Sequence, residues 1–250
     1  MRDHRYAAMF MPARQNITCL RILNRVQLPE TILAELVRLK KKNYYTYRHI
    51  LITALLSTKI SLDRQIPGHL DPYRMAALAV IHDLGKAKIP VSILNKRTPL
   101  TDAEFLIMKT HPLIGYLMVR YYCGKNYRTY AAACFEHHER LDGSGYPLRT
   151  TRMSKYSQVI AVVDMLDALI SRRPYRKQPY TMRAALDLLL EEANRGKINK
   201  TIVLLLICYA RATKPALNDL VVSQTKRDRE PEHNNYGKTV PDDSDDRVSP

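Results

Sequence analysis

Long apolar stretches at helical spacing are the feature that most restricts how this chain can fold. The stretches are rich in Ala, Leu, Ile and Met, and their apolar positions recur every three to four residues. The chain of 250 residues has only eight glycines, too few for a sheet protein with many tight turns. Hydrophobic residues make up 46% of the sequence, enough for a sizeable core. We therefore expect an all-α fold.

Capping residues predict where the helices begin. Asp71-Pro72 combines a capping carboxylate with a proline suited to the first turn. Thr101 and Glu104 have the spacing of a capping box, and the stretch Asp142-Gly143-Ser144-Gly145 interrupts the helical pattern as a loop. The expected helices cover about residues 28–42, 44–61, 71–83, 101–110, 112–122, 127–140, 155–171, 181–195 and 199–212.

The sequence divides into three parts. Residues 1–43 form an N-terminal helical lead-in, in which only the stretch after Pro29 shows an amphipathic pattern. Residues 44–213 form one catalytic-type domain. Residues 214–250 are polar and nearly free of apolar side chains, which predicts a disordered tail. The tail has six Lys/Arg against eight Asp/Glu, a net of −2, so of the total of +16 the preceding residues carry +18.

The positive charge favours an anionic partner, which includes nucleic acid, a membrane surface or a phosphate-bearing small substrate. No recognised nucleic-acid module accompanies the charge, so nucleic acid is the minor alternative. The longest apolar run, Ile202 to Ala210, is too short to span a bilayer, and no secretory leader is evident at the N-terminus. The cysteines are scattered and predict reduced core thiols: Cys19, Cys123, Cys134 and Cys208. We expect a cytoplasmic protein.

Histidines and aspartates concentrate at the expected helix ends. His82-Asp83 ends one helix, His111 lies between two, and His137-His138 ends another. Several imidazoles and carboxylates that converge on one pocket could hold a metal ion and activate water. Each element alone has a plainer interpretation: a lone helical His49 is more often a surface or core residue, and Asp164 and Asp167 could be solvated helix positions.

Four longer motifs give these residues a context. They read HDLGKAKIP from His82, LTDAEFLIMKTHPLIG from Leu100, HHERLDGSGYP from His137 and VVDMLDALISRRPYRK from Val162. In this order they resemble the HD-GYP family over about residues 44–195. The resemblance implies an HD-domain helical bundle with a GYP loop. It also implies a metal-dependent phosphodiesterase that hydrolyses a cyclic dinucleotide, foremost cyclic di-GMP.

The resemblance also implies a set of metal ligands. Carried over by position, the ligands are His49, His82, Asp83, His111, His137, His138 and Asp164. Asp83 would bridge two metal ions and take part in catalysis. The resemblance implies iron or manganese, and a set of imidazoles and carboxylates suits these ions better than a thiolate site would, although the sequence does not exclude zinc.

Four further residues match family positions that contact substrate. Lys86, one helical turn after His82, would reach a metal-bound phosphate, and Arg173 and Arg176 would bind phosphate oxygens with their forked guanidinium groups. Tyr146 in the GYP loop would touch the substrate with its ring or hydroxyl. The alternatives are a surface lysine, solvated arginines and a purely structural loop.

Three departures from the family pattern qualify these expectations. Tyr45 stands where some members have a glutamate that helps to hold a third metal, so we expect two metals and mainly the linear dinucleotide as product, with GMP as a further one. The stretch 148–153 is short and lacks the customary glycine, and Gln158 replaces a common arginine. They leave open a degenerate module that senses a cyclic dinucleotide or binds proteins without hydrolysis. A homodimer or signalling-protein partners also remain open.

Overall fold

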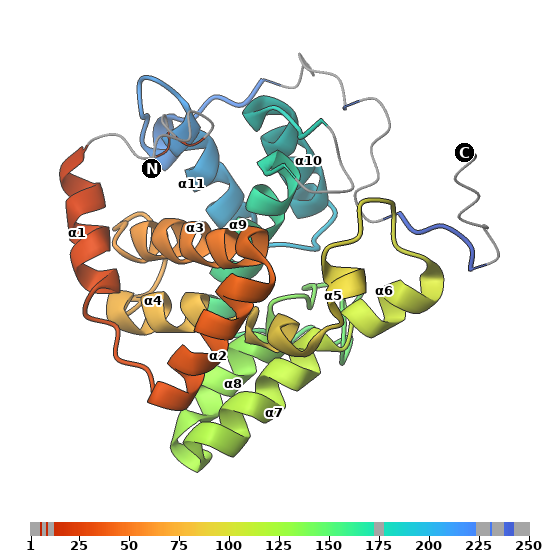
Figure 1. The fold of residues 1–250 in the computed structure, drawn as a ribbon. Coiled ribbons are helices and arrows are strands. Elements are labelled where there is room, and N and C mark those ends of the chain that lie inside the picture. Colours follow the sequence, from red (N-terminus) through yellow and green to blue (C-terminus); the bar gives the residue numbers. More distant parts are fainter. Residues whose placement is uncertain are drawn as a thin grey trace.

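The computed structural model describes residues 6, 9, 13–172, 178–223, 231 and 238–242. These residues fold mainly into helices that pack around a common centre (Figure 1). Among them no strand is found, and the β-type pairing is one isolated parallel bridge between Thr101 and Val240. The expected all-α fold is confirmed.

The helices follow the expected pattern, with ends that differ by a few residues. In chain order, with η marking 3-10 helices, they are α1 (Ala13–Leu23), α2 (Glu30–Lys42), α3 (Tyr44–Ser61), α4 (Pro72–Ile81), η2 (Leu84–Lys88), α5 (Val91–Leu94), α6 (Asp102–Met108), α7 (His111–Cys123), η3 (Lys125–Tyr127), α8 (Arg128–Glu136), α9 (Lys155–Ile170), α10 (Met182–Asn194), α11 (Lys200–Ala210) and η4 (Leu217–Asp219).

The capping signals act as the sequence predicts. The Asp71 side chain accepts a hydrogen bond from the Tyr73 amide, and Pro72 occupies the first turn of α4. At α6 the Glu104 amide donates to the Thr101 hydroxyl at 3.2 Å, while the Thr101 amide donates to the Glu104 carboxylate at 2.8 Å. This reciprocal pair satisfies amides that the first turn of a helix leaves without partners.

Two hydrophobic clusters share the central helices. The larger one is built from α3, α4, α9, α10 and α11, and the smaller one from α2, η2, α7 and α8 together with side chains of α3 and α4. Gly85 in η2 lets this segment approach α7 closely, since a Cβ there would collide with the His111 carbonyl. The close approach brings the residues after α4 next to the start of α7.

Two regions differ from the expectations. Helix α1 had no firm period in the sequence because Ile17 and Leu20 are exposed while Cys19 and Ile22 are buried, so apolar residues lie on both faces. The tail after residue 213 is not without packing, since three of its apolar side chains lie against the larger cluster: Leu217, Leu220 and Val222. The sequence predicts a disordered tail over residues 214–250, whereas these three side chains pack on the larger cluster.

Candidate metal centre

The seven expected ligands come from five separate helices and meet in one place. His49 lies within α3, His82 and Asp83 follow the last residue of α4, and His111 is the first residue of α7. His137 and His138 follow α8, and Asp164 lies within α9. Six of the seven residues are buried, and the His138 side chain keeps 16% of its surface exposed. Residues as far apart in the sequence as His49 and Asp164 therefore share a buried centre.

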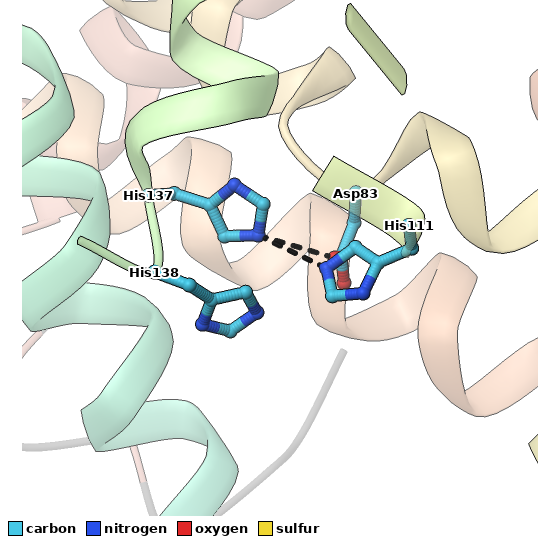
Figure 2. Close-up of side chains that lie close together, drawn as sticks. All are labelled: Asp83, His111, His137 and His138. Carbon is cyan, nitrogen blue, oxygen red and sulfur yellow. Dashed lines mark hydrogen bonds and ion pairs between the residues drawn. The ribbon is translucent and has the colours of Figure 1, made fainter. Parts of the chain in front are cut away.

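Asp83 lies at the middle of this centre. Its Oδ1 is 3.3 Å from His111 Nε2 and 3.6 Å from His137 Nε2 (Figure 2). Its Oδ2 is 3.6 Å from His49 Nε2 and 3.7 Å from His82 Nε2. Two groups of potential metal ligands therefore share one carboxylate: Asp83, His111, His137 and His138 form the first, and His49, His82 and Asp83 the second.

Three of the imidazoles are oriented in the same way. The Nδ1 of His82 lies 2.7 Å from the Ala79 carbonyl, that of His111 2.7 Å from Met108, and that of His137 2.8 Å from Cys134. Each partner is the carbonyl three residues earlier, so the end of a helix fixes the orientation of each ring. A proton on Nδ1 leaves the Nε2 lone pair directed at Asp83, which is the tautomer that a metal ion needs.

The donor set fits divalent metal ions. His82 Nε2 and Asp83 Oδ1 are buried and have no hydrogen-bond partner among the described residues. Such orphaned polar atoms are costly unless a cation or another partner satisfies them. Imidazole nitrogens and carboxylate oxygens together suit transition metals such as iron, manganese or zinc. The buried polar atoms without partners and the available ligand atoms therefore both favour metal binding at this centre.

Burial governs the protonation of the centre. It lowers the pKa of His82 to about 3 and that of His111 to about 4, because a buried imidazolium loses its hydration. Burial and the neighbouring His137 also hold the pKa of His138 well below its usual range. For Asp83 burial acts in the opposite direction, but the Lys86 ammonium and the imidazoles outweigh it and keep the pKa well below its ordinary value. Neutral imidazoles around a carboxylate are ready to bind a cation.

His49 is the exception, and two carboxylates explain it. Its Nδ1 is 2.5 Å from Asp167 Oδ2 and its Nε2 is 2.9 Å from Asp164 Oδ1. Burial alone would lower the pKa of His49, but these two carboxylates raise it to about 9. Both aspartates are buried, so the interpretation of Asp164 and Asp167 as solvated helix positions is wrong. The sequence offered no reason to single out Asp167, apart from its place one helical turn after Asp164.

The GYP loop lies against this centre. The Tyr146 ring stacks on the His138 ring, with centroids 4.7 Å apart and planes 21° apart, and the Lys109 ammonium lies 5.4 Å from the Tyr146 centroid. The buried Glu139 carboxylate accepts hydrogen bonds from the amides of Leu148 at 2.6 Å and Thr150 at 3.1 Å. Lys109 and Glu139 were not among the expected site residues, although Glu139 is next to His138 in the sequence.

The remaining expected residues have different outcomes. Lys86 donates to Asp83 Oδ2 at 2.6 Å and is 12% exposed, so its ammonium lies at the centre. Arg173 and Arg176 lie outside the described residues. Tyr45 is exposed, and Gln158 bonds to the Met153 carbonyl and to Asn199.

This helical fold with a buried His/Asp centre is that of a known family. A family model described as an HD domain matches residues 31–202, and the chain therefore belongs to the HD-domain family. A solved structure, an HD-GYP-type protein from Bdellovibrio bacteriovorus called Bd1817, is similar with a TM-score of 0.50 and 16% identity. The match covers 82% of this chain and 72% of that one, and it supports the shared fold.

Curated relatives place the chain within the family more closely. It is 39% identical over 148 residues to a cyclic di-GMP phosphodiesterase of Pseudomonas aeruginosa, covering 58% of this chain and 35% of that protein. It is 43% identical over 122 residues to the cyclic di-GMP phosphodiesterase response regulator RpfG of Xanthomonas campestris, covering 48% and 32%. The resemblance to HD-GYP proteins is confirmed. The chain spans about a third of the length of these relatives.

A comparison with a third relative concerns a different cyclic dinucleotide. The chain is 31% identical over 137 residues to a 3'3'-cGAMP-specific phosphodiesterase of Vibrio cholerae, covering 54% of this chain and 29% of that protein.

Among the described helices, none combines the length and the apolar character that a membrane span requires.

Proposed function

We propose that this chain hydrolyses a phosphodiester bond of a cyclic dinucleotide in a metal-dependent reaction, with cyclic di-GMP as the foremost substrate. The observation that carries the proposal is the position of Asp83, whose two oxygens face two groups of histidines. One carboxylate shared by two ligand groups suits a pair of ions. The names of the relatives supply the substrate class, and a basic chain suits an anionic substrate.

The proposed ligands are the seven residues of the centre. His111, His137 and His138 would hold one ion and His49, His82 and Asp164 the other, with Asp83 common to both. When bound, two divalent ions polarise a phosphodiester and lower the pKa of water. We propose that the two ions are iron or manganese. The exposed Tyr45 offers no carboxylate for a third, and this supports a count of two.

The chain's own residues have separate roles in this proposal. The Lys86 ammonium, one turn after His82, offsets negative charge on a bound phosphate. The Tyr146 ring, held flat against His138, offers a stacking surface for a base beside the centre. Lys109 adds positive charge near that ring. Arg173 and Arg176 are further candidates for binding phosphate, on the resemblance alone.

The test is a reaction with defined metals and resolved products. Protein purified anaerobically is incubated with cyclic di-GMP or 3'3'-cGAMP and with iron(II) or manganese(II), and the products are separated by chromatography. We expect cyclic di-GMP to be opened mainly to the linear dinucleotide, because the second cut must position a flexible product again over the same centre. Mononucleotide that accumulates without a linear intermediate would contradict this product assignment.

A second candidate is a binding module without turnover. The exposed Tyr45 in place of a carboxylate and the short stretch 148–153 favour it. Such a module would bind the cyclic dinucleotide, with or without metal, and release it unchanged. Saturable binding of cyclic di-GMP combined with no product after metal loading would select this function.

We also propose that the protein is cytoplasmic. For the whole protein we propose two further kinds of partner, a second copy of the chain in a homodimer or a signalling protein.

A further inference from the structure

A second set of residues lies at the Nδ1 side of the His49 ring. Asp167 is 1% exposed, and its Oδ2 lies 2.5 Å from His49 Nδ1. Its Oδ1 accepts a hydrogen bond from the Ser171 hydroxyl at 2.9 Å and another from the Tyr6 hydroxyl. One carboxylate oxygen therefore faces the imidazole, while two hydroxyl groups hold the other oxygen.

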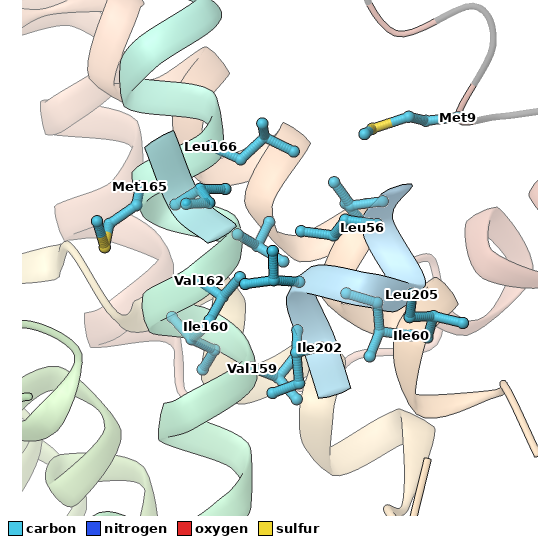
Figure 3. Close-up of a cluster of buried hydrophobic side chains, with 14 of the residues drawn as sticks. Met9, Leu56, Ile60, Val159, Ile160, Val162, Met165, Leu166, Ile202 and Leu205 are labelled. Atoms are coloured by element: carbon cyan, nitrogen blue, oxygen red, sulfur yellow. The ribbon is translucent and has the colours of Figure 1, made fainter. Parts of the chain in front are cut away.

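Tyr6 reaches this position from the far N-terminus, 161 residues from Asp167 in the sequence. Tyr6 and Met9 form one turn, closed by a 2.9 Å hydrogen bond from the Met9 amide to the Tyr6 carbonyl. Met9 is fully buried in the larger hydrophobic cluster (Figure 3), and the Lys59 ammonium donates to its carbonyl. Packing and this hydrogen bond place the Tyr6 ring in the interior, where it is 3% exposed.

We propose that Asp167 is a positioning residue for His49 and that the Tyr6 hydroxyl holds the Asp167 carboxylate in place. N-terminal residues outside the matched HD domain would then support the metal centre. The inference rests on the proposed metal-binding role of His49. An imidazole ligand usually donates its second ring N–H to a carboxylate or carbonyl, which fixes the ring and its tautomer. His82 and His137 obtain this support from carbonyls at the ends of their own helices, and His111 obtains it from the last residue of α6, whereas His49 lies within α3. Its support comes from another helix.

The two hydroxyl groups have a geometric task. A carboxylate can rotate about its Cβ–Cγ bond and exchange its oxygens, which would move the acceptor away from His49 Nδ1. Hydrogen bonds from Tyr6 and Ser171 to Oδ1 oppose this rotation and satisfy the buried charge. Loss of the Tyr6 hydroxyl therefore loosens His49 without removing any ligand of the centre.

The chain offers a matched control for this effect. The Tyr209 hydroxyl also donates to an aspartate, Asp63 Oδ2, at 2.7 Å, and Tyr209 is buried. Tyr6→Phe and Tyr209→Phe thus delete the same kind of hydrogen bond. Only the first deletion touches the residue that supports His49.

The experiment measures manganese(II) affinity by calorimetry and the melting temperature of the metal-free protein, for the wild type and for the variants Asp167→Asn, Ser171→Ala, Tyr6→Phe and Tyr209→Phe. We expect Asp167→Asn to weaken manganese binding by roughly 10–100-fold, as for other residues that orient a metal ligand. Tyr6→Phe should weaken it by roughly 3–10-fold, since it removes one hydrogen bond to the carboxylate. Tyr209→Phe should lower the melting temperature and leave the affinity unchanged.

Two results would overturn the inference, and they are distinguishable. If Tyr6→Phe binds manganese like the wild type and only melts earlier, as Tyr209→Phe does, Tyr6 has a structural role alone. If the wild type itself binds no manganese, iron or zinc, the proposed metal centre fails and the inference with it. Should Asp167→Asn not fold, Tyr6→Phe and Ser171→Ala still decide the question, since both leave the carboxylate in place.

Discussion

The buried Asp83 carboxylate is the residue on which the centre depends. Four imidazole nitrogens lie within 3.7 Å of its oxygens, and the Lys86 ammonium contacts it at 2.6 Å. Ligand and charge partner can be separated by substitution, because Lys86 contacts Asp83 but belongs to neither ligand group.

We predict that Asp83→Ala removes both the metal and the turnover, whereas Lys86→Ala keeps the metal and lowers kcat by about 100-fold or more. The reason is that Asp83 alone is common to both ligand groups, while Lys86 supplies only charge near the reacting phosphate. Elemental analysis and turnover of cyclic di-GMP check the two variants. Wild-type turnover in both would contradict the assigned roles.

Glu139 has a role that can be separated from metal binding. Both of its carboxylate oxygens accept backbone amides of the loop that places Tyr146 on His138. We predict that Glu139→Gln lowers kcat/KM by about tenfold with metal content unchanged, because an amide can replace only one of the two acceptors. The control is Asp142→Asn in the same loop, whose exposed carboxylate accepts hydrogen bonds from the amide and the hydroxyl of Ser144. An equal loss in both variants would assign the effect to general loosening of the loop.

At the scale of elements, helix ends supply most of the centre. The ends of α4 and α8 and the start of α7 provide five of the seven proposed ligands. The first turn of a helix leaves N–H groups and the last turn leaves carbonyls without helical partners, so Nδ1 of His82 and His137 finds an acceptor at the end of its own helix. A site built in this way is rigid, because moving a ligand requires moving the end of a helix.

The C-terminal segment gives a prediction at the same scale. Truncation after Ser223 removes the bridge between Thr101 and Val240, and truncation after Thr213 should cost about 1–3 kcal/mol more than that. The second cut removes Leu217, Leu220 and Val222, which pack on the larger cluster, and the Lys214 bond to the Tyr209 carbonyl. Chemical denaturation of the two truncated proteins measures the difference. Equal stability would mean that these contacts contribute nothing.

For the whole molecule, we expect the proposed metal binding to be linked to folding. The ligands come from five helices that span both hydrophobic clusters, so only the folded chain presents them together. We predict that manganese(II) at about 100 times its dissociation constant stabilises the protein by about 2.7 kcal/mol for each ion bound, which raises the melting temperature by roughly 5–10 °C per ion. Chelation should reverse the shift, and Asp83→Ala should show none. An equal shift in that variant would place the ion elsewhere.

Much of this protein follows from local sequence. Helical periodicity and the Asp71 and Thr101 caps depend on residues a few positions apart, and so do the short motifs around His82 and His137. The sequence alone therefore predicts the helices and identifies the candidate ligands. Such patterns act through backbone hydrogen bonds and side-chain spacing, which are local properties. The resemblance carried by those motifs then pointed to the family.

Only the tertiary structure decided the rest. The burial of Asp167 and the hydrogen bond from Tyr6 to it join residues 161 positions apart, and no local pattern encodes such a contact. The packing of Leu217 and the order of α1 likewise depend on a hydrophobic surface that exists only when distant helices assemble. Local propensity selects helices, but which side of each helix loses contact with water depends on its neighbours, since burial belongs to the assembled chain.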